Sequence, residues 1–112
     1  MNKFGISEDI FRKIVGTIEK FPSIEQVYVF GSRARGDFSK GSDLDLALSG
    51  ENITSKEVNL LQDALDNLNT IISIDIVNID EIEKEKLSNN IKKEGVLIYD
   101  RKRQVKREVF RL

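Results

Sequence analysis

The sequence predicts a single α/β (α+β) domain, built on a small mixed sheet of about four strands with helices mainly on one face. Short apolar stretches rich in β-branched residues alternate along the chain with longer stretches in which apolar residues recur at helical spacing. The chain has 112 residues, of which 39% are hydrophobic and 33% charged, so it can bury one modest core.

Helices are expected where apolar residues recur every three or four positions. These stretches are residues 7–21, 55–68 and 81–93. Ser7 is suited to cap the first helix, and Pro22 should end it. Thr54 or Ser55 is suited to cap the second helix, and Asp80 the third.

Strands are expected at the short apolar runs between these helices. The runs are residues 25–30, 43–49, 71–79 and 96–99. The run at 71–79 is β-branched, apolar and short, which is typical of a central strand. Residues 1–99 are therefore expected to form the domain, and residues 100–112 a basic tail.

The stretch around which the rest is organised is residues 30–48, FGSRARGDFSKGSDLDLAL, between the first two expected strands. Gly31 lacks a Cβ, so its backbone could approach a ligand closely. Ser32 is a good helix cap and also offers a hydroxyl, and a helix that opens there would direct N–H groups at an anion. Arg33 and Arg35 add positive charge. These features together favour a phosphate-binding turn.

Carboxylates follow this turn. Asp43 and Asp45 lie two residues apart at the start of a strand, so both should point to one face, while Leu44 points to the core. Two adjacent carboxylates repel each other unless a cation lies between them, and Mg²⁺ prefers such ligands together with substrate phosphates. Asp75 interrupts an apolar run, either as a structural acid with a partner or as a third carboxylate of this site.

The motif closely resembles the signature of the nucleotidyltransferase superfamily related to DNA polymerase beta, and most of all its minimal nucleotidyltransferases. In both, Gly-Ser is followed by ten residues and then Asp-x-Asp. Arg33, Arg35 and Ser42 also match that subfamily. The resemblance covers nearly the whole chain and implies the nucleotidyltransferase core fold. It also implies a third acidic residue on a later strand, for which Asp75 is the candidate.

The resemblance implies Mg²⁺, as a pair of ions, and ATP as the substrate. The residues implied as both catalytic and metal-binding are Asp43, Asp45 and Asp75. Those implied to bind the nucleotide are Gly31, Ser32, Arg33, Arg35 and Ser42.

The family also implies a partner. Stand-alone minimal nucleotidyltransferases resemble antitoxins of type VII-like toxin–antitoxin systems, which transfer AMP from ATP to a tyrosine of a cognate HEPN-domain ribonuclease toxin. Larger relatives add domains that grip the acceptor, so a second subunit or partner must supply the acceptor here. Two alternatives stay open: a non-catalytic subunit that blocks its partner sterically, and an adenylyltransferase that acts on a small molecule such as an antibiotic.

Composition narrows the chemistry further. The sequence has no cysteine and no histidine, so acid–base catalysis must use Asp, Glu, Lys or Tyr.

Neither a membrane-spanning stretch nor a signal-type apolar segment is visible, which favours the cytoplasm. The basic residues of 100–112 lack an aromatic stacking platform, so a solvated tail is favoured, with contact to nucleic acid or an acidic partner as the alternative.

Overall fold

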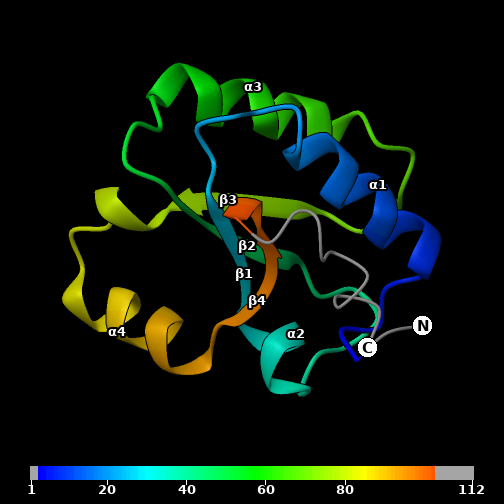
Figure 1. Ribbon diagram of the computed structural model, residues 1–112. Coiled ribbons are helices and arrows are strands. Elements are labelled where there is room, and N and C mark those ends of the chain that lie inside the picture. Colours follow the sequence, from blue (N-terminus) through cyan, green and yellow to red (C-terminus); the bar gives the residue numbers. More distant parts are fainter. Residues whose placement is uncertain (1–2, 103–112) are drawn as a thin grey trace.

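The computed structural model describes residues 3–102 of the chain (Figure 1). Its elements, in order, are α1 (Glu8–Ile18), β1 (Gln26–Phe30), α2 (Ser32–Arg35), β2 (Leu44–Ser49), α3 (Ser55–Asp66), β3 (Ile74–Asn78), the 3₁₀ turn η1 (Ile79–Glu81), α4 (Glu85–Glu94) and β4 (Val96–Asp100). The predicted order of helices and strands is therefore confirmed, with differences at several boundaries.

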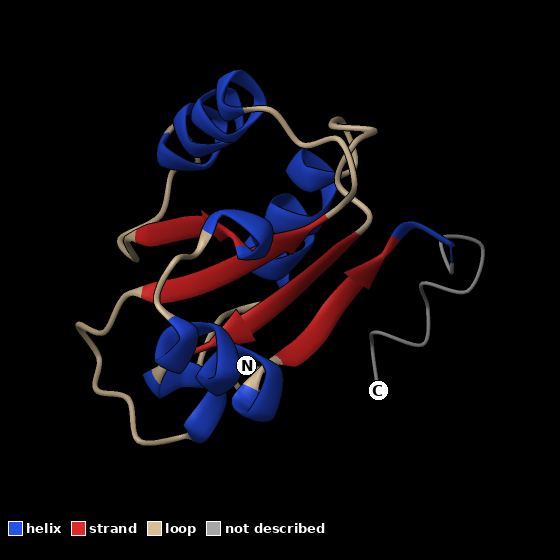
Figure 2. Cartoon of the chain, turned by 90° about the vertical axis from the view of Figure 1, so that its left-hand side faces the viewer, coloured by secondary structure: helices blue, strands red, loops and turns tan. Residues whose placement is uncertain are grey.

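The strands form one sheet in the order β3-β2-β1-β4. β1 pairs antiparallel with both β2 and β4, while β2 and β3 are parallel, so the sheet is mixed as predicted. α1 and α3 lie together over one face, whereas α4 lies on the opposite side (Figure 1). Figure 2 shows the strands lengthwise and side by side, with helices above and below them. This is the α/β nucleotidyltransferase-like architecture that the sequence predicts, although α4 lies on the face opposite α1 and α3, where the prediction placed the helices mainly on one face.

The main core lies between the sheet and the pair α1 and α3. Leu44, Leu46 and Leu48 alternate along β2 and are almost completely buried in this core. Asp45 lies between two of these leucines and must point to the opposite face, because successive side chains of a strand alternate. The same alternation that builds the core therefore directs a carboxylate away from it.

The helix ends follow local hydrogen bonding. Ser7 caps α1 by accepting from the Ile10 N–H, as predicted. Thr54 caps α3 in a reciprocal capping box with Glu57. α1 ends earlier than expected, at Ile18, because Phe21 N–H turns back to the Ile18 carbonyl before Pro22 is reached. The prediction that Asp80 caps the next helix is wrong: Asp80 lies inside η1, and Asn78 accepts from its N–H.

The prediction that residues 71–79 form a central strand is also wrong. β3 begins at Ile74 and lies at the edge of the sheet, and Ile71 is 96% exposed. The free edge of β3 is covered by the side-chain amide of Gln62 on α3. Gln62 Nε2 donates to the Ile74 carbonyl (2.7 Å), and its Oε1 accepts from Ile76 N–H (3.2 Å). One amide thus imitates a neighbouring strand and protects the edge from pairing with another chain.

The end of β4 is fastened to the domain by Arg101. Its guanidinium donates to the carbonyls of Ile24 and Phe21 (3.0 Å each) and lies over the Tyr99 ring. Asp100, expected in the tail, is the last residue of β4. The predicted basic tail otherwise lies mostly outside the described residues. No helix within residues 3–102 is long and apolar enough to cross a membrane.

The role of Gln62 predicts a stability effect. Replacing Gln62 by Leu removes both hydrogen bonds to the edge of β3 and should lower the free energy of unfolding by about 2 kcal/mol. The measurement is urea unfolding followed by circular dichroism. The matched control is Asn59→Leu on an exposed position of α3, which should stay within about 0.5 kcal/mol of wild type. Equal stability of the two variants would contradict this role.

Candidate active site

The three predicted carboxylates meet at one end of the sheet, where β2 and β3 begin. Asp45 and Asp75 are direct register partners in the parallel pair β2 and β3, and Asp43 immediately precedes β2. Burial raises the pKa of Asp45, and the nearby charges of Asp75 and Asp43 raise it further. The structure therefore brings Asp43 and Asp75 close enough to Asp45 for both to repel its charge.

Gly31 lies on the other side of Asp45, at the end of β1. Phe30 is the register partner of Asp45, so the turn that follows passes the carboxylate closely. A Cβ on Gly31 would lie 2.5 Å from Asp45 Oδ2, and the residue has φ +76°. Glycine is thus required here both by its conformation and by the approach of Asp45. The sequence predicted close approach to a ligand, and the structure adds this contact within the site.

Ser32 is the first residue of α2, and Gly31 is its N-cap. The expectation that Ser32 itself caps the helix is wrong, since within residues 3–102 no side chain makes a capping hydrogen bond to α2. The chain turns at once because the N–H groups of Ala34 and Arg35 both donate to the Gly31 carbonyl. Ser32 is half-buried and directly follows Gly31.

Arg33 is 2% exposed, so its side chain lies inside the protein. Its guanidinium donates to the carbonyl of Phe4 (2.9 Å) and twice to that of Ser42 (3.1 and 2.9 Å), and it stacks on Phe38 at 4.8 Å from the ring centre. Because Ser42 directly precedes Asp43, Arg33 fixes the segment that carries the first carboxylate. Sequence reasoning treated Arg33 only as a phosphate-binding cation.

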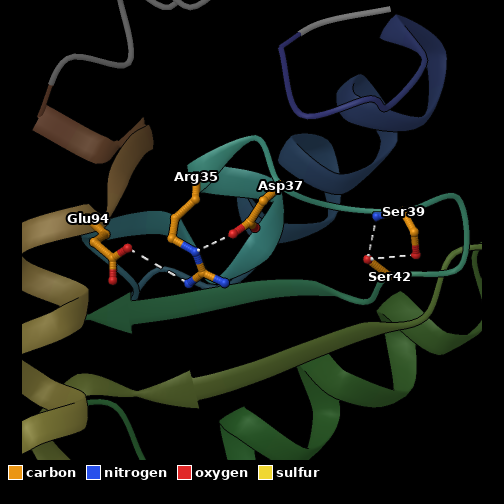
Figure 3. A network of polar contacts seen from close by, with 5 residues as sticks. All are labelled: Arg35, Asp37, Ser39, Ser42 and Glu94. Carbon is orange, nitrogen blue, oxygen red and sulfur yellow. Dashed lines mark hydrogen bonds and ion pairs between the residues drawn. The ribbon is translucent and has the colours of Figure 1, made fainter.

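Ser42 also organises the loop that leads to Asp43. Its hydroxyl accepts from the Ser39 N–H (2.9 Å) and lies 3.3 Å from the Ser39 hydroxyl (Figure 3). With its carbonyl held by Arg33, Ser42 is tied at both its backbone and its side chain. These contacts close the loop between α2 and β2 locally.

Arg35, by contrast, is exposed. Its guanidinium donates to Asp37 Oδ2 (3.1 Å) and lies 3.8 Å from Glu94 on α4 (Figure 3). The hydrogen bond and charge of Asp37 raise the pKa of Arg35. Of the two predicted arginines, Arg35 is the one whose side chain a solvent-borne anion can reach.

The donor set suits Mg²⁺ in the presence of a nucleotide. In the described part of the chain, no group of three or more His, Cys, Asp or Glu side chains is arranged so that it could hold a metal ion alone. Mg²⁺, however, usually takes one or two carboxylates and completes its shell with water and substrate phosphates. Asp43 and Asp45 supply hard oxygen ligands of this kind. The pKa of Asp45 is raised first by burial and then by the charges of Asp75 and Asp43, and a cation would relieve the repulsion by these two charges.

A family model described as "Polymerase beta, Nucleotidyltransferase" matches residues 12–104, most of the chain and all of the site. The chain belongs to this nucleotidyltransferase family. This match confirms the family resemblance seen in the sequence. No protein of curated function matches the sequence.

Solved structures share the fold of this nucleotidyltransferase-family chain. A chain from the complex of tri-AMPylated Shewanella oneidensis HEPN toxin with MNT antitoxin superposes with a TM-score of 0.63 at 18% identity, covering 94% of this chain and 80% of that chain. A toxin–antitoxin chain crystallised with AMP-PNP gives 0.61 at 22%, over 89% and 79%. A chain of a mutant MntA–HpeT toxin–antitoxin gives 0.65 at 18%, over 89% and 79%. At these identities the likeness establishes the fold.

The different surroundings of the two arginines predict different effects of their loss. Arg33→Met should lower the free energy of unfolding by about 3 kcal/mol, because the carbonyls of Phe4 and Ser42 lose their donors inside the protein. Arg35→Met should leave stability nearly unchanged, because its ion pairs are exposed, but should weaken nucleotide binding. Denaturant unfolding and nucleotide titration of both variants check this. Loss of stability in Arg35→Met, but not in Arg33→Met, would contradict the assignment.

The raised pKa of Asp45 predicts a pH dependence. The folded state binds this proton more tightly than the unfolded chain does, so Asp45 costs nothing below its ordinary pKa of 3.8 and lowers stability as the pH rises through its raised value. In metal-free buffer at neutral pH, Asp45→Asn should therefore melt at a higher temperature than wild type, and the difference should vanish in acid. Melting curves across pH test this, with Asp63→Asn on α3 as the control. A variant that melts below wild type at neutral pH would refute it.

Proposed function

We propose that this protein transfers AMP from ATP to a tyrosine hydroxyl of a HEPN-domain toxin, with Mg²⁺, as the antitoxin of a type VII-like toxin–antitoxin system in the cytoplasm. The observation that carries the proposal is the position of Asp45, which lies between Gly31 at the end of β1 and Asp75 on β3. A turn suited to phosphates and a group of carboxylates suited to a reacting centre are thereby adjacent.

Two of the similar structures support the finer parts of this proposal. One is named for AMP-PNP, which is an ATP analogue, and another for an AMPylated HEPN toxin together with an MNT antitoxin. Both share the fold of this chain over most of its length.

The residues divide the work according to their positions. Gly31 and Ser32 hold the outer phosphates of ATP, with Arg35 adding charge from the surface. Asp43 and Asp45 would hold Mg²⁺, which when bound neutralises charge on the phosphates as the bond to the leaving group breaks. Arg33 and Ser42 fix the segment that carries Asp43, which keeps the carboxylates in place before ATP arrives.

Asp75 acts on the acceptor. It is exposed and sits beside Asp45, so a hydroxyl that approaches the α-phosphate from the β3 side can pass its proton to this carboxylate. The acceptor oxygen forms a bond to the α-phosphorus, the bond from that phosphorus to the β-phosphate oxygen breaks, and pyrophosphate leaves. Since the chain has no histidine, a carboxylate is the natural proton acceptor.

The proposal predicts which change abolishes transfer. Asp43→Asn removes a charged ligand while keeping the shape, so transfer should fall at least about a hundredfold. The assay is mass spectrometry of the co-purified HEPN partner, in which each transfer adds one AMP unit. The control Asp63→Asn should transfer normally. If the partner is never AMPylated but Asp43→Asn still neutralises it, the protein works by steric blocking instead.

A further inference from the structure

A groove with a volume of about 520 Å³ opens beside Asp75. It lies between the end of α3, the connection that follows it and the start of β3, and its lining includes Asp66, Leu68, Ile71 and Ile72. Asp75 thus belongs both to the group of three carboxylates and to the wall of this groove. The groove therefore borders the candidate active site at Asp75, which is the one carboxylate of that site among the groove's described lining residues.

We propose that this groove is the acceptor subsite, and that it receives an apolar, neutral-to-basic protein segment that carries the acceptor hydroxyl. This inference rests on the proposed nucleotidyl transfer and adds where, and by what chemistry, the protein substrate is held. Three features of the structure carry it: the order of groups across the sheet, the character of the groove lining, and the occupied edge of β3.

The order of groups across the sheet fixes the direction of attack. In an in-line displacement the entering and leaving oxygens lie on opposite sides of the phosphorus. Gly31 and Ser32 lie at the end of β1, Asp45 on β2, and β3 on the far side of β2. With the outer phosphates at Gly31, pyrophosphate leaves toward β1, and the acceptor must enter from the side of β3. The groove opens on that side.

The lining of the groove excludes an anionic occupant. Asp66 and Asp75 contribute two carboxylates, and the described lining residues include neither lysine nor arginine. A triphosphate or an RNA backbone would be repelled there. Ile71 is 96% exposed, and Leu68 and Ile72 are half-buried next to it. An apolar protein segment would cover these side chains, and a basic residue within it would pair with the carboxylates.

The edge of β3 limits how the segment can bind. Gln62 already occupies the Ile74 carbonyl and the Ile76 N–H, so an incoming chain cannot extend the sheet at these positions. Recognition must instead use side chains inserted into the groove. This suits the delivery of one hydroxyl side chain to Asp75 better than a paired strand would.

The absence of cysteine allows a direct test. We would place single cysteines at Ile71, in the groove, and at Leu60, the other large exposed hydrophobic residue of the described chain, which does not line the groove. Maleimide labelling of I71C and L60C is followed alone, with Mg-ATP, and with the HEPN-domain partner. AMP transfer to the partner is measured in parallel. The partner should slow labelling of I71C at least about tenfold and leave L60C unchanged, because thiol reactivity follows access.

The outcomes separate the groove from the reaction. Selective protection of I71C by the partner, with transfer slowed at least about tenfold in labelled I71C, supports the groove as the acceptor subsite. Transfer without protection of I71C overturns the groove and leaves the reaction standing. Protection by Mg-ATP alone assigns the groove to the nucleotide and also overturns it, as does equal protection of both positions. Selective protection without any AMP transfer supports docking in the groove and refutes the proposed reaction.

Discussion

Repulsion of the Asp45 charge by Asp43 and Asp75 is the constraint that the rest of this structure has to withstand. Asp45 is half-buried between Asp43 and Asp75, and its pKa is raised by its burial and by both neighbours. The hydrophobic core keeps it there: Leu44 and Leu46, on either side of Asp45, cannot leave the core without exposing large apolar surfaces. The free energy gained by burying these leucines is therefore partly offset by the repulsion between the carboxylates that they hold in place.

The hydrogen bonds donated by Arg33 also hold the site in place. This side chain joins the segment before α1, at Phe4, to the loop before β2, at Ser42. Neither residue lies in a helix or strand, and a buried cation with several donors is a fitting partner for both carbonyls. The loop that carries Asp43 is thus anchored to the domain on one side and runs into β2 on the other.

The sequence predicted the parts of this site that depend on local spacing. Alternation along β2 was enough to orient Asp45. The Gly-Ser turn predicted a close backbone approach to a ligand, and the contact that the structure shows at Gly31 is with Asp45. The edge position of β3 could not be read from its apolar run, because Ile74 and Ile76 look the same in a central strand. The free edge of β3 is occupied by Gln62, a dozen residues earlier on a helix, and its hydrogen bonds to the strand leave no local pattern in the sequence. The burial of Arg33 likewise depends on Phe4, which is distant in sequence.

Helix geometry explains why the two arginines of the motif have different surroundings. Residues two apart on an α-helix are separated by about 200°, so Arg33 and Arg35 must point to nearly opposite sides of α2. One of them can enter the interior only if the other faces solvent. Phe38 and the Ser42 carbonyl draw Arg33 inward, which leaves Arg35 outside beside Asp37 and Glu94. An incoming phosphate would therefore compete with these carboxylates for a guanidinium that is already charged and exposed.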